Sequence, residues 1–74
     1  MTPEEAFGAT LRELRTESGV SQGFLALEAD LDRTYISLLE RGLRQPSLKT
    51  IIVLAEGLGI SPSVLFDRTM QKLS

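Results

Sequence analysis

The chain has 74 residues, a formal net charge of −2, and neither cysteine nor histidine. This length fits one domain, near the lower limit for folding alone, and the composition excludes disulfides, the common zinc sites and catalysis by Ser-His-Asp or Cys-His groups. We therefore expect a single domain over residues 1–74 with no enzyme activity, no metal and no cofactor.

No targeting or membrane segment is expected. Glu4 and Glu5 lie where a secretion signal needs positive charge. The longest purely apolar run, residues 51–55, is far shorter than the roughly 20 residues that cross a bilayer. These features predict a cytoplasmic protein.

Helix start and stop signals recur at short intervals and predict about five short helices. In the first, Pro3 suits the opening turn, and apolar residues keep a helical spacing until Gly19. The apolar residues of this first helix are Phe7, Leu11 and Leu14.

The second and third predicted helices are short and follow each other closely. Ser21 is a suitable N-cap for the second, which ends near residues 30–31. Asp32 can cap the third, and Gly42 can supply the left-handed residue after it. The core residues expected from these helices are Leu25, Ala26, Ala29, Ile36 and Leu39.

The fourth and fifth predicted helices have clear caps. Ser47 can cap the fourth, which Gly59 closes, and Ser61 followed by Pro62 opens the fifth. Because strand signals are weak, the predicted fold class is all-α. The apolar stripe expected to pack from the fourth helix is Leu48, Ile51, Leu54, Ala55 and Leu58, and the fifth helix bears Val64, Leu65 and Phe66.

Residues 21–42 predict two short helices joined by a tight turn, which leaves the second free to enter a DNA major groove. The motifs, in order, are Ser21-Gln22, Leu25-Ala26, Leu31-Asp32-Arg33-Thr34-Tyr35-Ile36-Ser37, Leu39-Glu40-Arg41-Gly42, Pro46-Ser47-Leu48, Leu54-Ala55 and Leu58-Gly59-Ile60-Ser61-Pro62. Together they resemble the phage-repressor/Cro/Xre helix-turn-helix family. The run 32–37 followed by residues 40–41 is similar to the controller proteins of restriction-modification systems.

The resemblance implies a lambda-repressor-like domain in which the third helix contacts bases. Arg33, at its start, has the bidentate donors that match guanine O6 and N7, and Thr34 and Ser37 share its exposed face. We expect these three residues to determine the DNA sequence that is bound. The alternative is that they form an ordinary solvated helix face.

Three further residues are expected to contact phosphates. Gln22 begins the second helix, where a side-chain amide and free N–H groups can hold an anion. Arg44 lies in the loop after the third helix, and the hydroxyl of Tyr35 can donate to a phosphate. For Tyr35 the alternative is that its ring only covers the junction of the two helices.

The resemblance also implies a structural ion pair. The family joins an arginine late in the first helix to a glutamate near the end of the third, and Arg15 and Glu40 hold these positions. We expect a bidentate contact that orients the third helix, with two unrelated surface charges as the alternative.

Three places depart from the family pattern: Gly23 with Phe24 in the second helix, Leu38 in the third, and Val53, which fills an expected polar position of the fourth. Phe24 occupies an early position of the second helix that is commonly polar, so it is either exposed or covered by a partner. Leu38 lies where a polar residue often contacts bases. It either touches a thymine methyl group or lines the edge of the bundle.

The charge is unevenly distributed. Residues 33–49 hold four basic residues and one acidic residue, or +3, whereas the rest of the chain holds four basic and nine acidic residues, or −5. A positive stretch of this kind can dock on phosphates, while the acidic remainder limits indiscriminate binding to nucleic acid.

The two C-terminal helices have more apolar residues than one small core can bury. Since an exposed apolar patch lowers solubility and a symmetric contact buries it twice, we expect residues 47–74 to form a homodimer interface. The residues expected at this interface are Ile52, Val53, Val64, Phe66 and Met70.

Together these features predict a sequence-specific transcriptional regulator that binds double-stranded DNA as a homodimer on a pseudo-palindromic operator, with no small-molecule effector. An autoregulatory restriction-modification controller is the favoured subtype. The alternative is an antitoxin-like protein whose main role is to bind a protein partner through Phe24 and the fourth helix. An enzyme is the weakest alternative, because the chain also lacks a glycine-rich phosphate loop.

Overall fold

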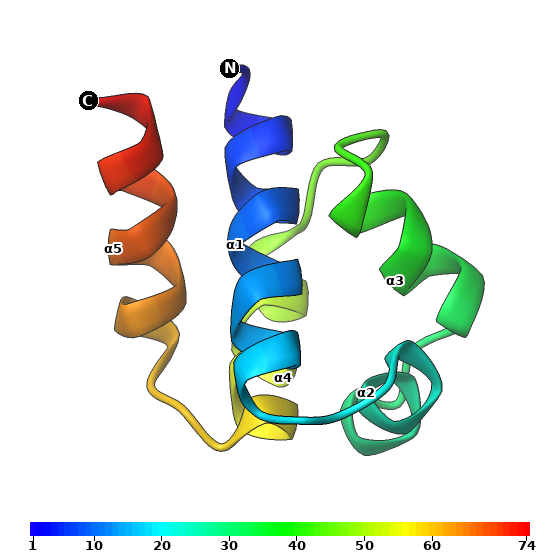
Figure 1. The fold of residues 1–74 in the computed structure, drawn as a ribbon. Coiled ribbons are helices and arrows are strands. Elements are labelled where there is room, and N and C mark those ends of the chain that lie inside the picture. The colour runs from blue at the N-terminus through cyan, green and yellow to red at the C-terminus, as the bar shows by residue number, and fades with distance from the viewer.

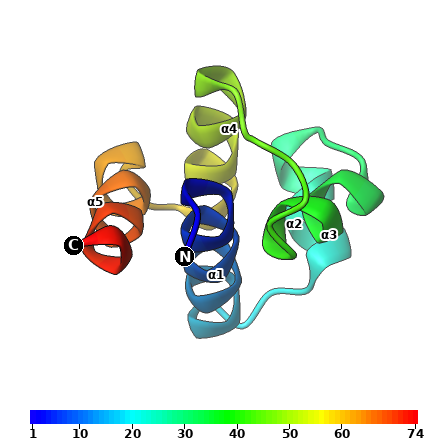
Figure 2. The same ribbon diagram turned by 90° about the horizontal axis from the view of Figure 1, so that it is seen from above.

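Five helices and no strand make up the computed structural model, which describes residues 1–74. The helices are α1 (Pro3–Glu17), α2 (Gln22–Ala29), α3 (Arg33–Glu40), α4 (Leu48–Leu58) and α5 (Pro62–Leu73). Figures 1 and 2 show α1 at the centre, with α5 along one side and α2 and α3 on the other. The predicted all-α, five-helix fold is confirmed.

The predicted N-caps form the expected hydrogen bonds. The side chain that precedes each of α2 to α5 accepts a backbone N–H from the first turn of its helix. In α1 the cap is Thr2, whose own N–H donates to Glu5 Oε1 at 2.8 Å, and this hydrogen bond lowers the pKa of Glu5. The caps are Thr2, Ser21, Asp32, Ser47 and Ser61.

Left-handed glycines follow α3 and α4, as predicted. Gly42 has a φ of 73° and Gly59 a φ of 70°, values that favour residues without a Cβ.

None of the five helices is long and apolar enough to cross a membrane alone. The α4–α5 pair meets the length and composition requirement but is bent by 111°.

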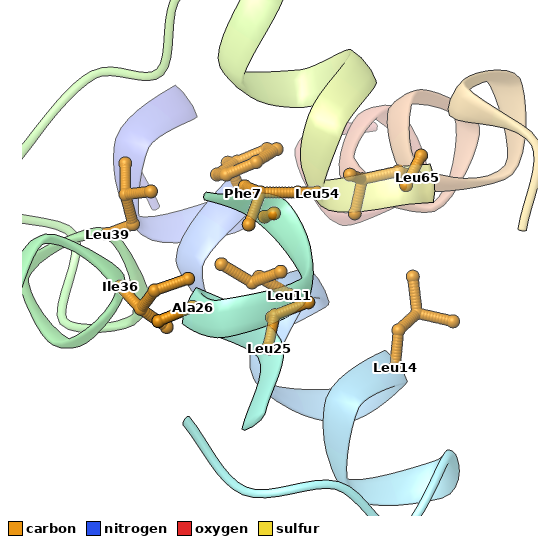
Figure 3. Packing of buried hydrophobic residues seen from close by; sticks show 11 residues of the cluster. Phe7, Leu11, Leu14, Leu25, Ala26, Ile36, Leu39, Leu54 and Leu65 are labelled. Atoms are coloured by element: carbon orange, nitrogen blue, oxygen red, sulfur yellow. The ribbon is translucent and has the colours of Figure 1, made fainter. Parts of the chain in front are cut away.

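One hydrophobic cluster joins all five helices, and Figure 3 shows its side chains meeting between them. A cluster of this kind is the main source of stability in so small a fold. It consists of Phe7, Leu11, Leu14, Leu25, Ala26, Ala29, Ile36, Leu39, Leu54, Ala55 and Leu65.

Leu48 was expected in this core but is 75% exposed. Its position is compatible with the apolar stripe of α4, but it opens the helix, and Figure 2 shows the first turn of α4 extending past α1 and α5. In α5, Leu65 is buried, whereas Val64 and Phe66 are exposed. The helical spacing therefore predicted which side of α4 Leu48 lies on, but not whether another helix covers that position.

Val53 differs from its prediction in the opposite direction, because it is more buried than expected. It was expected to contribute surplus apolar surface, yet it is half-buried and packs against the core cluster. With Ala29 and Leu31 it lines a recess between α4 and the turn after α2. Most of this side chain is therefore covered within one copy of the chain.

Arg15 of α1 and Glu40 of α3 form a bidentate ion pair. Nε of Arg15 donates to Oε2 at 2.6 Å, Nη2 donates to Oε1 at 3.1 Å, and Nη1 donates to the carbonyl of Val20 at 2.9 Å. The Glu40 side chain is 3% exposed and that of Arg15 is 15% exposed, so water screens the pair little. The hydrogen bond to Glu40 and its charge raise the pKa of Arg15, and the guanidinium remains charged.

Gly8 allows α1 to approach the end of α3 directly. A Cβ at residue 8 would lie 2.3 Å from the carbonyl oxygen of Leu39 and 2.7 Å from that of Glu40. Both distances are far below van der Waals contact. The two backbones therefore touch beside the ion pair, without an intervening side chain.

We predict that Arg15→Ala and Glu40→Ala each lower the free energy of unfolding by about 3 kcal/mol, because each leaves the partner's charge buried and unpaired. The double variant should lose clearly less than the sum of the single losses. Urea unfolding of the four proteins measures this coupling. Additive losses would show that the pair does not act as a unit.

We predict that Gly8→Ala lowers the free energy of unfolding by about 2 kcal/mol or more, because α1 and α3 must separate. Gly23→Ala is the matched control. The nearest atom to its new Cβ, Cδ of Arg33, is 3.8 Å away. Alanine favours helix over glycine by roughly 1 kcal/mol, so thermal unfolding should show opposite shifts, and equal shifts would contradict the close approach.

Candidate nucleic-acid interface

A tight turn sets the angle between α2 and α3. Asp30 ends α2 in the left-handed region, with a φ of 56°, which aspartate tolerates better than most residues. The N–H of Leu31 donates to the carbonyl of Ala26 at 2.9 Å, and the Leu31 side chain packs against the core. This turn leaves α3 at the edge of the molecule, as Figure 1 shows.

One face of α3 is buried and the other points outward. Ile36 and Leu39 are fully buried, whereas Arg33 and Thr34 are exposed. Ser37 is half-buried and follows Arg33 by four residues, so both lie on the same side of the helix. The three residues predicted to contact bases therefore share the outward face.

Tyr35 and Leu38 lie at the borders of that face. Both are half-buried, and Tyr35 packs against the core cluster. The alternative considered for Tyr35, a ring that covers the helix junction, describes this packing. A phosphate contact through its hydroxyl group stays a prediction.

Gln22 and Arg44 are the other two residues predicted to contact phosphates. Arg44 is exposed in the loop between α3 and α4, where it forms no ion pair. Gln22 is half-buried at the start of α2, and its Nε2 donates to Glu40 Oε1 at 3.0 Å. The sequence did not predict this contact, because it depends on where the end of α3 lies.

Arg41 is a further candidate for contact with DNA, although its residue type and spacing predicted no role for it. It caps the C-terminal end of α3, is exposed, and follows Ser37 by four residues. The helical spacing alone places it on the outward side of α3, beside the predicted base contacts.

The cations of the chain fall into two groups. Outside residues 33–49, three of the four form ion pairs: Arg15–Glu40, Arg68–Glu17 and Lys72–Glu13. Inside this range, all four are exposed and form no ion pair: Arg33, Arg41, Arg44 and Lys49. Apart from Arg12 on α1, the uncompensated positive charge therefore lies on α3, the following loop and the start of α4, where an anionic ligand can reach it.

The residues predicted for a homodimer interface do not all face the same direction. Phe66 and Met70 line an apolar cavity of about 200 Å³ with Phe7, Ile51 and Leu73. Ile52 is exposed on α4. Val64 is also exposed, but at about 100° per residue it lies about 200° around α5 from Phe66 and so faces another direction.

Comparisons with known proteins agree with this geometry. The family model described as Helix-turn-helix matches residues 11–65. Control protein C.BamHI of Bacillus amyloliquefaciens is 47% identical over 64 residues, which cover 85% of this chain and 79% of the relative. The curated relatives also include proteins named as HTH-type transcriptional regulators.

Solved structures give the same result. The restriction-modification controller protein C.AhdI from Aeromonas hydrophila is 49% identical, with a TM-score of 0.83, over 85% of this chain and 96% of that one. The clp gene regulator ClgR from Corynebacterium glutamicum is 28% identical, with a TM-score of 0.93, over 100% of this chain and 96% of that one. The chain therefore belongs to the helix-turn-helix family of DNA-binding transcription regulators, which includes the controller proteins of restriction-modification systems.

Proposed function

We propose that this regulator binds a pseudo-palindromic operator as a homodimer in the cytoplasm and acts as an autoregulatory controller of a restriction-modification system. The observation that carries the proposal is the set of unpaired cations on α3, the following loop and the start of α4. Its relatives C.BamHI and C.AhdI, named as control or controller proteins, support the subtype.

In the proposed complex, α3 lies in the major groove. The guanidinium of Arg33 donates to a guanine, while Thr34 and Ser37 contact neighbouring base edges. Arg44 contacts the backbone electrostatically, as do groups at the start of α2. The first set of contacts provides specificity, and the second provides most of the salt-dependent affinity.

The homodimer is proposed to form through α5 and the adjoining face of α4. Phe66 is 53% exposed, and together with Met70 it lines the apolar cavity. A two-fold contact buries this surface in both copies and sets a fixed distance between the two α3 helices. Val53 is left out of this interface because it packs within its own chain.

The second candidate function is an antitoxin-like protein that mainly binds a protein partner. The observation that favours it is the apolar pair Phe24 and Leu27, both exposed on α2 and three residues apart. In a DNA-binding regulator the proposed base contacts come from α3, so they do not explain why these two apolar side chains are exposed on α2. A variant of both residues that retains operator binding but loses a partner would favour this second function.

Selection of bound duplexes from a random pool tests DNA binding. We predict two symmetric half-sites about one helical turn apart, with affinity that falls steeply as salt rises.

Arg33→Ala should lose about 1–3 kcal/mol per half-site and relax the preference at one base position, whereas Arg44→Ala should weaken all duplexes alike. An unchanged preference in Arg33→Ala would make Arg33 a phosphate contact.

We predict that Phe66→Glu shifts the protein from dimer to monomer, because it places like charges near each other across the two-fold contact. Leu27→Glu is the matched control, since Leu27 is 78% exposed on α2, away from α5. Analytical ultracentrifugation at tens of micromolar protein measures the oligomeric state of both variants, and circular dichroism checks that their helix content is unchanged. A monomeric wild-type protein, or dissociation by Leu27→Glu alone, would show that the interface lies elsewhere.

A further inference from the structure

Glu40 accepts hydrogen bonds from two different helices through one oxygen. Its Oε1 accepts Nη2 of Arg15 at 3.1 Å and Nε2 of Gln22 at 3.0 Å, while its Oε2 accepts Nε of Arg15. The end of α3 is thereby joined to α1 through an ion pair and to α2 through a neutral amide.

The orientation of the Gln22 amide follows from its partner. A carboxylate oxygen can only accept, so the nitrogen of the amide must face Glu40. This nitrogen has two hydrogens, and Glu40 takes one of them. The other hydrogen, at the start of α2, forms no hydrogen bond within the chain.

The backbone around Gln22 also has free donors. The N–H groups of Gln22 and Gly23 have no acceptor, because the cap Ser21 accepts the N–H of Phe24 and the helical ladder begins at Leu25. A phosphate at the start of α2 can therefore receive hydrogen bonds from the backbone and from the second amide hydrogen without breaking the bond to Glu40.

We propose that Gln22 is a positioning residue that couples the phosphate contact of α2 to the orientation of α3 through Glu40. The proposal extends the proposed DNA-binding function. In it, Gln22 affects base specificity although it touches no base. A residue that only contacts phosphate would instead weaken binding to every sequence by the same factor.

The test compares Gln22→Met, which keeps the length of the side chain but removes the amide, with the wild-type protein. We expect Gln22→Met to reduce affinity for the selected operator about tenfold more than affinity for a scrambled duplex. Equal losses on the two duplexes, or a lower melting temperature with an unchanged affinity ratio, would overturn the proposal.

A second set of variants reverses the hydrogen bond. Gln22→Glu places two carboxylates together, with Arg15 as the only cation that bonds to Glu40. We expect its operator affinity, relative to wild type, to recover about tenfold as the pH falls from 8 to 5.5, since a proton between the carboxylates restores the donor. Combining it with Glu40→Gln exchanges amide and carboxylate and leaves a single acid, so this pH dependence should disappear, while the lost Arg15–Glu40 ion pair should lower stability at every pH.

The same proteins without DNA keep the two proposals distinguishable. Gln22→Glu should melt at a lower temperature at pH 8 than at pH 5.5 relative to wild type, and the exchanged pair should not. If no duplex is selected, the DNA-binding function fails while these melting curves still measure the Gln22–Glu40 coupling. A pH dependence that persists in the exchanged pair would indicate simple repulsion from phosphate and would overturn the coupling.

Discussion

A carboxylate that is taken out of water must receive hydrogen-bond donors, or it strongly destabilises the fold. Glu40 is such a group, with 3% of its side chain exposed. Its donors come from Arg15 on α1 and Gln22 on α2, two helices separated by a loop. Positions of α3 that pull Glu40 away from these donors leave a buried charge unsatisfied, so the ion pair restricts how α3 can lie on the bundle.

The close contact at Gly8 strengthens this restriction. Where α1 touches the carbonyls of Leu39 and Glu40, a single methyl group would force the helices apart. On the buried face of α3, Ile36 and Leu39 pack fully into the core. Backbone contact, ion pair and apolar packing thus act on one short helix, and its outward side chains remain on a rigid support, as sequence-specific contacts require.

The sequence predicted the features that depend on neighbours along the chain. Capping hydroxyls and carboxylates act within one turn, and a left-handed glycine acts at a single residue, so Ser47 and Gly59 could define α4 correctly. Exposure depends on which other helix covers a position. For this reason Leu48 was wrongly placed in the core, while Val53, expected as surplus apolar surface, packs partly buried against it.

In the candidate site, too, features set within one helix were predicted and features set by packing between helices were not. The spacing of residues 33, 34 and 37 was sufficient to place them on one face of α3, because a helix fixes that relation locally. Gln22 was assigned to phosphate alone, since its contact with Glu40 spans 18 residues and needs the packed arrangement of two helices. Helical spacing also left Arg41 available but unassigned, because spacing places a side chain without stating its role.

An acidic chain can bind DNA when its positive charge is free and its negative charge is used elsewhere. Three glutamates neutralise cations on α1 and α5, whereas the four cations of residues 33–49 are unpaired. The unpaired positive charge is therefore concentrated on α3, the following loop and the start of α4. We therefore propose that tight binding depends on base contacts of α3 from both copies of the proposed homodimer.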